Sequence, residues 1–196
     1  ERQPLEYLSE MRQVTILFIN LMIVEESSKI ELCTTLQKAF DTIYTNAKSM
    51  QGCLNKIFMF DKGSTFLVIF GLPGFKHEND CAHALKAAYK MREEVLTIDR
   101  ILNASIGVTT GSTFCGVVGH PHRHEYTVIG RKVNMAARLM MYYPDKVTCD
   151  SETFHHSKLH KGNFISLELK QMKGLANVGQ IREYNPSTST KDTIEE

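Results

Sequence analysis

A chain of 196 residues, of which 42% are hydrophobic, is long enough to form one globular domain with its own core. The 23 Lys and Arg residues nearly balance the 22 Asp and Glu residues, which argues against a broad basic surface for nucleic acid or an anionic membrane. The chain contains no apolar run of about eighteen residues and does not start like a secretory leader, so we expect a cytoplasmic domain without a membrane span. Its five widely spaced cysteines form no CxxC pair, which disfavours a zinc site or a disulfide framework.

The first third of the chain predicts a strand, a helix and a hairpin. The nearly continuous apolar, β-prone run at residues 14–21 is typical of a central strand buried on both faces. Ser28 and Glu31 form a capping box, and apolar residues then recur at helical spacing as far as Ala47. Two short β-type runs follow, at residues 56–60 and 65–70, with hairpin chemistry between them.

The middle of the chain repeats the pattern of helix and strand. Asp80 is expected to cap a second helix, whose apolar stripe extends to Val95. An alternating strand at residues 102–108 is expected to turn at Gly111 and Ser112 and to return as residues 113–118. A strand at residues 125–129 then leads through Gly130 into a third helix.

The order of these elements is βαββαβ with additions, which indicates an α+β fold with a ferredoxin-like core. A short strand near Val147, a helical turn at residues 151–157 and β-like runs at residues 165–169 and 180–184 complete the domain, which we place at residues 1–185. The polar tail at residues 186–196 is expected to be disordered. A ferredoxin-like fold supports many functions, so the function has to be argued from particular residues.

One long segment carries a specific resemblance. The run Tyr126-Thr-Val-Ile-Gly-Arg-Lys-Val-Asn-Met-Ala-Ala-Arg-Leu139 resembles the signature strand and helix of the class III nucleotide cyclase catalytic domain. The order of the surrounding elements agrees with this family over residues 10–185, so the resemblance covers a whole domain. Within the family, the chain is similar to the second (C2) cyclase domain of the bicarbonate-responsive, soluble adenylyl cyclases.

The resemblance implies that this domain lacks the metal site of the family. Members that bind two divalent ions use one Asp at the end of the first strand and another in the following hairpin. The matching positions hold Asn20 and Ser64, and neutral oxygens are poor ligands for Mg²⁺. Asp61 lies nearby as a candidate shifted ligand, although a turn residue bonded to its own backbone explains it better. Two Mg²⁺ ions would then be held by a partner cyclase domain with both Asp residues.

The catalytic residues that the resemblance implies are Asn134 and Arg138. They are four residues apart on the third helix and therefore share one face. In the family the Asn orients the ribose and the Arg meets the phosphate whose charge changes during ring closure. The alternative is an exposed polar pair on a solvated helix face.

Base selection is assigned by the same resemblance to Lys56, Thr127 and the backbone of Val128. An ammonium group only donates hydrogen bonds, whereas a hydroxyl also accepts, and this pair suits N1 and the 6-amino group of adenine better than guanine. Many membrane-bound relatives carry Asp in place of Thr127. The alternative for Lys56 is a lysine at a strand edge that faces water. Lys173 is a weaker candidate for contact with the triphosphate.

The sequence thus predicts half of an adenylyl cyclase site, which forms 3′,5′-cyclic AMP and pyrophosphate from ATP when it is paired with a metal-binding cyclase domain. The resemblance adds bicarbonate as a candidate ligand at the interface of the paired domains. Two alternatives stay open: a non-catalytic domain that only dimerises or binds nucleotide, and half of a guanylyl cyclase. The intact Asn134 and Arg138 argue against the first, and Lys56 with Thr127 argues against the second.

Overall fold

The computed structural model describes residues 9–24, 28–60, 63–120, 122–175 and 177–188. Its strands are β1 (Glu10–Ile23), β2 (Gly52–Phe60), β3 (Gly63–Phe70), β4 (Ile101–His120), β5 (Arg123–Ile129), β6 (Val147–Cys149), β7 (Phe164–Ser166) and β8 (Arg182–Tyr184). Its helices are α1 (Lys29–Ser49), α2 (Asp80–Val95), α3 (Arg131–Tyr142) and α4 (Ser151–Ser157), with 3₁₀ turns at Lys161–Asn163 and Pro186–Thr188.

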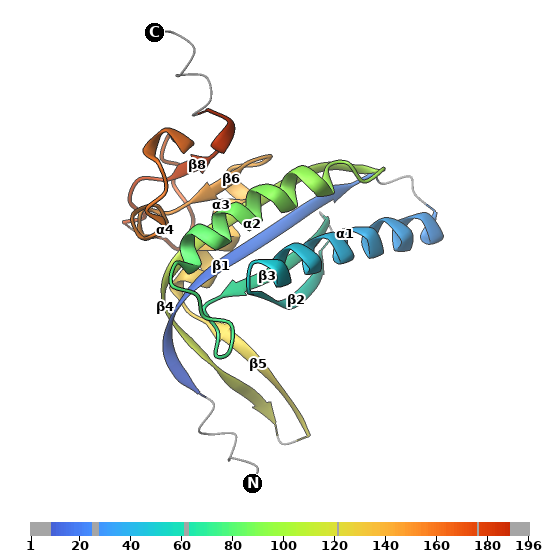
Figure 1. Ribbon diagram of the computed structural model, residues 1–196. Coiled ribbons are helices and arrows are strands. Elements are labelled where there is room, and N and C mark those ends of the chain that lie inside the picture. The colour runs from blue at the N-terminus through green and yellow to red at the C-terminus, as the bar shows by residue number, and fades with distance from the viewer. Residues whose placement is uncertain (1–8, 25–27, 61–62, 121, 176, 189–196) are drawn as a thin grey trace, which may run out of the picture.

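The strands form one mixed sheet in the order β2-β3-β1-β4-β6-β8-β7, and β5 pairs with β4 (Figure 1). All the pairings are antiparallel except β4 with β6. The order β1-α1-β2-β3-α2-β4 is the βαββαβ arrangement that the sequence predicts, so the α+β class is confirmed.

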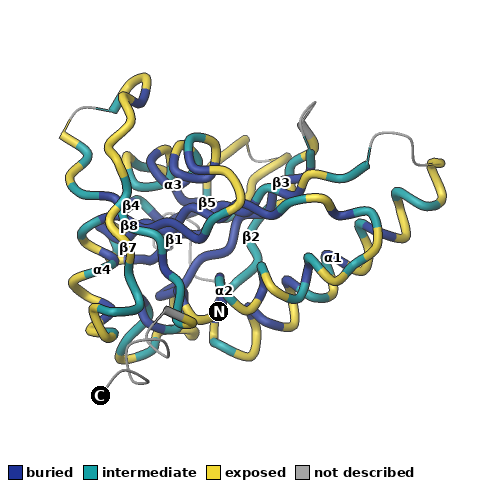
Figure 2. The backbone as a smooth tube through the Cα atoms, turned by 90° about the horizontal axis from the view of Figure 1, so that it is seen from above, coloured by how far each residue is buried: buried dark blue, intermediate teal, exposed yellow. Residues whose placement is uncertain are grey.

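The central strand β1 separates two hydrophobic layers. Successive side chains point to opposite faces of a strand. Leu17 and Ile19 therefore belong to the core that α1 and α2 cover, whereas Ile16 and Phe18 belong to a second core beneath α3. Seen from above, α3 lies on one side of the strands and α1 and α2 lie on the other (Figure 2).

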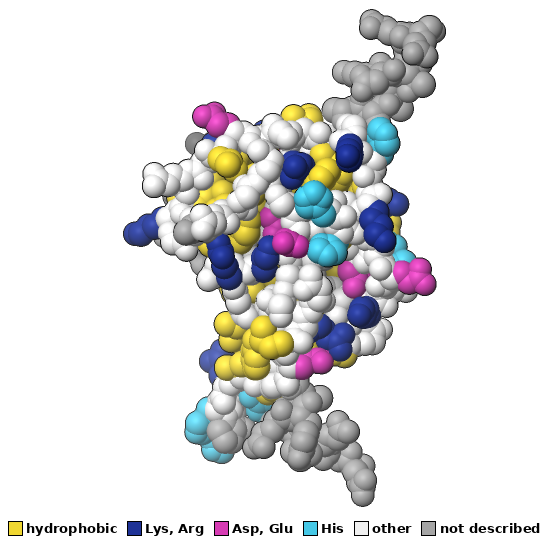
Figure 3. Space-filling view, turned by 90° about the vertical axis from the view of Figure 1, so that its left-hand side faces the viewer, with side chains coloured by type: hydrophobic (Ala, Val, Ile, Leu, Met, Phe, Trp, Pro, Cys, Tyr) yellow, Lys and Arg dark blue, Asp and Glu magenta, His cyan; other side chains and the backbone are white. Residues whose placement is uncertain are grey.

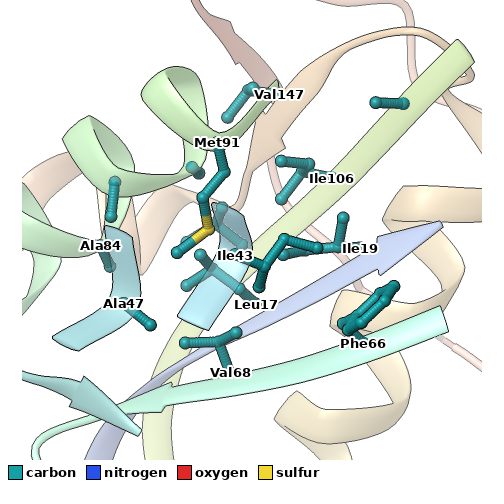
Figure 4. Packing of buried hydrophobic residues seen from close by; sticks show 14 of the residues in the cluster. Leu17, Ile19, Ile43, Ala47, Phe66, Val68, Ala84, Met91, Ile106 and Val147 are labelled. Atoms are coloured by element: carbon teal, nitrogen blue, oxygen red, sulfur yellow. The ribbon is translucent and has the colours of Figure 1, made fainter. Parts of the chain in front are cut away.

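The layer beneath α1 and α2 is the larger core. The predicted capping box of α1 is confirmed, because Ser28 N–H donates to Glu31 and Glu31 N–H donates to the Ser28 hydroxyl. Figure 4 shows Met91 of α2 beside Ile43 of α1 and Leu17 of β1, and all three are fully buried. These contacts hold the two helices on one face and leave the other face to α3.

The turn predicted at Gly111 and Ser112 is wrong, because β4 runs through both residues without interruption. Both pair with β1, where Gly111 lies opposite Val14. A Cβ atom on Gly111 would lie 2.8 Å from a carbon of the Lys132 side chain, so this glycine gives space to a neighbouring helix. The β4 strand then continues to pair with β5.

The start of α2 also differs from the prediction. Asn79 is the N-cap, because its side chain accepts a hydrogen bond of 3.0 Å from Ala82 N–H. Asp80 is the first helical residue instead, and its carboxylate accepts from His77 N–H at 3.0 Å. The helix therefore begins one residue earlier than a cap at Asp80 would imply, and its apolar stripe is as predicted.

The carboxyl-terminal part holds the short elements that the sequence suggests. Helix α4 spans residues 151–157, as predicted, whereas the β-like runs near residues 165 and 182 contribute only three paired residues each. In the expected tail, residues 186–188 form a 3₁₀ turn, and residues 189–196 lie outside the described residues.

The surface mixes charges of both signs. On the face in Figure 3, cationic and anionic side chains are interspersed with yellow hydrophobic patches. Among the described residues, no helix is both long and apolar enough to cross a membrane.

Candidate active site

Helix α3 lies unusually close to β4. A Cβ atom on Gly107 would lie 2.1 Å from the carbonyl oxygen of Ala136, so only glycine permits this approach. The Thr109 hydroxyl donates to the carbonyl oxygen of Lys132 at 2.7 Å and fixes the first turn of the helix. With Ala136 and Leu139 buried against the sheet, Asn134 and Arg138 lie on the exposed side of α3.

A cavity of about 810 Å³ opens beside α3. Asn134 and Arg138 both line it, so the structure brings the two predicted catalytic residues to one wall. Neither side chain has a hydrogen bond or ion pair with another described residue, which leaves both free to meet a ligand. The other lining residues come from the sheet and from the segment before β8: Phe18, Asn20, Phe58, Met59, Thr65, Ala137, Met140, Met141, Lys173, Gly174 and Leu175.

Lys173 lines this cavity from the segment that precedes β8. It is exposed and also lines an adjoining hollow of about 550 Å³ with Tyr142 and Met172. Its ammonium group lacks an ion-pair partner among the described residues. The cavity therefore offers two cations, Arg138 and Lys173, to an anionic ligand. The family resemblance had marked Lys173 as a weaker candidate for contact with the triphosphate.

The two positions that hold metal ligands elsewhere in the family do not fit Mg²⁺ in this chain. Asn20 lines the cavity, but its amide oxygen accepts a hydrogen bond of 3.2 Å from the Thr65 hydroxyl. Ser64 is buried and does not line the cavity, and its hydroxyl donates to Met59 Sδ at 3.2 Å. The described residues contain no group of three His, Cys, Asp or Glu side chains that is suited to a metal. Asp61 lies outside the described residues.

The residues predicted to read the base lie apart from this cavity. Lys56 on β2 and Thr127 and Val128 on β5 are not among its lining residues. The Lys56 ammonium donates to Glu125 Oε1 at 2.6 Å, and Thr127 and Val128 are only 7% and 5% exposed. The structure thus brings the Lys56 side chain to β5, and Lys56 does not line the cavity of Asn134 and Arg138.

Sequence reasoning missed Glu125 altogether. No local sequence motif marks this residue, because its partner Lys56 is remote in the sequence. The two strands that carry them, β2 and β5, are not hydrogen-bonded neighbours. On the reverse side of β5, burial raises the pKa of Tyr126, and its hydroxyl has no hydrogen-bond partner within the described part of the chain.

Comparison with known proteins agrees with this geometry. The family model described as the adenylate and guanylate cyclase catalytic domain matches residues 6–184. The chain belongs to this family. The cyclase domain is 48% identical to human adenylate cyclase type 10 over 91% of its own length, and 47% identical to the rat protein over 92%. It spans only 11% of the length of each of these relatives.

Solved structures share the fold of this cyclase domain at low identity. The adenylyl cyclase CyaB from P. aeruginosa is 23% identical with a TM-score of 0.75, and the alignment covers 90% of this chain and 95% of that one. The catalytic core of a rhodopsin-guanylyl cyclase with converted specificity, in complex with ATPαS, is 21% identical with a TM-score of 0.78 and covers 90% and 97%. Because adenylyl and guanylyl cyclases both match, the fold does not select the base.

Proposed function

We propose that this cyclase domain, at residues 1–185, is the substrate-orienting half of an adenylyl cyclase. It would form 3′,5′-cyclic AMP and pyrophosphate from ATP when paired with a second cyclase domain. The observation that carries the proposal is the cavity that both Asn134 and Arg138 line, with neither side chain bonded to another residue in the described part of the chain. The 48% identity to an adenylate cyclase supports the choice of reaction.

In the proposed reaction, the ribose 3′ oxygen attacks the α-phosphorus in line, and the bond from that phosphorus to the bridging oxygen of pyrophosphate breaks. The 3′ hydroxyl proton is released. Asn134 would hold the ribose so that the 3′ oxygen faces the α-phosphorus. The bound substrate would then already have the geometry that the reaction needs. Arg138 would meet the charge that develops on the phosphoryl oxygens, where a fixed cation stabilises the transition state more than the ground state.

Base selection is proposed for Lys56 and Thr127. The ammonium group would donate to N1 of adenine, and the Thr127 hydroxyl would accept from the 6-amino group. Guanine would set its N1–H against the ammonium group, and an unmatched buried donor costs about 1–3 kcal/mol. The backbone of Val128 would add a second acceptor for the amino group. ATP is therefore the proposed substrate.

The family implies two Mg²⁺ ions, which Asn20 and Ser64 are not suited to hold. We therefore assign the metal ligands to the partner domain and derive no step through them in this chain. Bicarbonate at the interface of the two domains and a cytoplasmic location remain parts of the proposal that rest on the similarity to the bicarbonate-responsive branch.

A substrate comparison tests the proposal. The chain is mixed with a metal-binding cyclase domain, and cyclic nucleotide formation is measured with ATP and with GTP. We expect cyclic AMP to dominate, with a ratio of catalytic efficiencies of about 10 or more. A preference for GTP would favour the guanylyl cyclase alternative, and no product from either nucleotide would favour a regulatory domain.

A further inference from the structure

The ion pair of Lys56 with Glu125 joins two strands that the sheet keeps apart. In the sheet, β3, β1 and β4 separate β2 from β5. The Lys56 ammonium nevertheless lies 2.6 Å from Glu125 Oε1, and the Asn55 amide donates to the carbonyl oxygen of Tyr126 at 3.3 Å. The sheet therefore curls enough to bring these two strands within side-chain reach. Asn55 and Lys56 are consecutive residues of β2, and Glu125 and Tyr126 are consecutive residues of β5.

Glu125 is well placed to fix the Lys56 ammonium group. Residues two apart on a strand point to the same face, so Glu125 and Thr127 share one face of β5, and Tyr126 points to the other. Glu125 is 65% exposed in its side chain, whereas Lys56 is 21% exposed. The lysine stem is thus mostly covered, and its charged end is held by Glu125, which shares a face of β5 with Thr127.

The carboxylate of Glu125 does not occupy all the hydrogen-bond donors of the Lys56 ammonium group. A lysine has three N–H donors, and the bond to Glu125 engages one of them. The carboxylate also balances the charge of Lys56, so the ammonium can approach an uncharged purine edge while it keeps a counter-ion. Without that anchor, the four-carbon lysine stem would have to give up its rotamer freedom when nucleotide binds.

We propose that Glu125 is a positioning residue for base recognition, which holds the Lys56 ammonium beside Thr127. This inference rests on the proposed roles of Lys56 and Thr127. It adds a carboxylate whose contribution is made through Lys56 rather than by contact with the nucleotide. Because the ion pair is partly exposed, its removal is expected to raise KM for ATP by only about threefold to fivefold.

The test is a double-mutant cycle in the active assembly of this chain with a metal-binding cyclase domain. The variants are Glu125→Ala, Lys56→Ala and the double variant, with ATP and GTP as substrates. Glu125→Ala is expected to raise KM for ATP about threefold to fivefold, to change kcat little and to lower the ATP to GTP preference. Combined with Lys56→Ala, it is expected to have no further effect. Glu125→Gln, which keeps an acceptor, is expected to lie between Glu125→Ala and the parent.

The controls separate this inference from the function on which it rests. Glu78→Ala removes the same charge from an exposed loop and should match the parent chain. If Lys56→Ala changes the ATP to GTP ratio but Glu125→Ala does not, the positioning role is wrong and base selection by Lys56 stands. If Lys56→Ala leaves the ratio unchanged, both are wrong. A lower KM in Glu125→Ala, or an effect that persists in full without Lys56, also contradicts the positioning role.

Discussion

Lys132 Nζ lies 2.6 Å from Oδ2 of Asp150, whose side chain is only 1% exposed. The same carboxylate accepts hydrogen bonds from the backbone N–H and the hydroxyl of Thr153 and so caps α4. Through this ion pair the first turn of α3, just before Asn134, is attached to the start of α4. One buried carboxylate therefore links α4 to the start of the helix that carries Asn134 and Arg138.

The first prediction concerns the stability that this ion pair provides. Lys132→Met leaves the Asp150 charge buried without its cation, and we expect it to lower the free energy of unfolding by about 2–4 kcal/mol. Asp150→Asn keeps an acceptor for Thr153 and should cost about 1–2 kcal/mol. The double variant should be more stable than Lys132→Met alone, because no unpaired charge remains.

These free energies can be measured by urea unfolding of each variant. The exposed pair of Lys90 with Glu94, 3.7 Å apart, supplies the control, and Lys90→Met should change stability by less than about 0.5 kcal/mol. Equal losses for Lys132→Met and Lys90→Met would show that the buried pair has no special role.

The second prediction concerns Arg138. Arg138→Ala should lower kcat by about 10²-fold or more with a smaller effect on KM, because the cation meets charge that develops in the transition state. Both constants are measured in the paired domains. Arg123→Ala removes an exposed arginine of β5 and serves as the matched control. A change confined to KM would mean that Arg138 only binds substrate.

The third prediction concerns the base. Lys56→Glu supplies an acceptor for the N1–H of guanine, and Thr127→Cys removes a good hydrogen-bond acceptor. Together they should lower the ATP to GTP ratio of catalytic efficiency by about 10-fold or more, even if total activity falls. Cyclic nucleotide formation from each substrate gives the ratio. An unchanged ratio would remove both residues from base selection.

The fourth prediction concerns alkaline pH. Burial raises the pKa of the Cys149 thiol well above its usual range, and burial raises those of Cys81 and Cys115 in the same direction. Above about pH 9 the unfolded chain therefore loses protons that the folded chain keeps, and the free energy of unfolding falls as pH rises. Below the ordinary thiol pKa this contribution is constant.

The slope of unfolding free energy against pH measures this linkage. Cys149→Ala should make the slope near pH 10 shallower by up to about 1.4 kcal/mol per pH unit. Cys33 is exposed, so Cys33→Ala is the control for the loss of a cysteine. Identical slopes for the two variants would contradict the raised thiol pKa in the folded chain.

Local patterns predicted most of the fold. The capping box at Ser28 and the apolar run of β1 carry their own signals, because hydrogen bonds and burial there depend on neighbouring residues. Gly111 misled the prediction, since a glycine that leaves room for the Lys132 side chain has the same appearance in sequence as a glycine in a turn. Asn79 was missed as a cap because the adjacent Asp80 is an equally good candidate by residue type.

The site was less accessible to sequence reasoning than the fold. Helical spacing places Asn134 and Arg138 on one face, and the structure brings both to the same cavity. Glu125 had no such signal, because its ion pair with Lys56 depends on how far the sheet curls. Contacts between strands that are not hydrogen-bonded neighbours arise from tertiary geometry and leave no local pattern.

The central claim is that this chain supplies substrate orientation and depends on another domain for its metal ions. It is tested most directly by cyclic AMP formation from Mg-ATP by the purified chain, alone and with increasing amounts of a metal-binding cyclase domain. We expect no activity above background for the chain alone, and activity that rises with the partner until the two are equimolar. Robust cyclic AMP formation by the chain alone, with Arg138→Ala as the inactive control against contaminating cyclase, would contradict the claim.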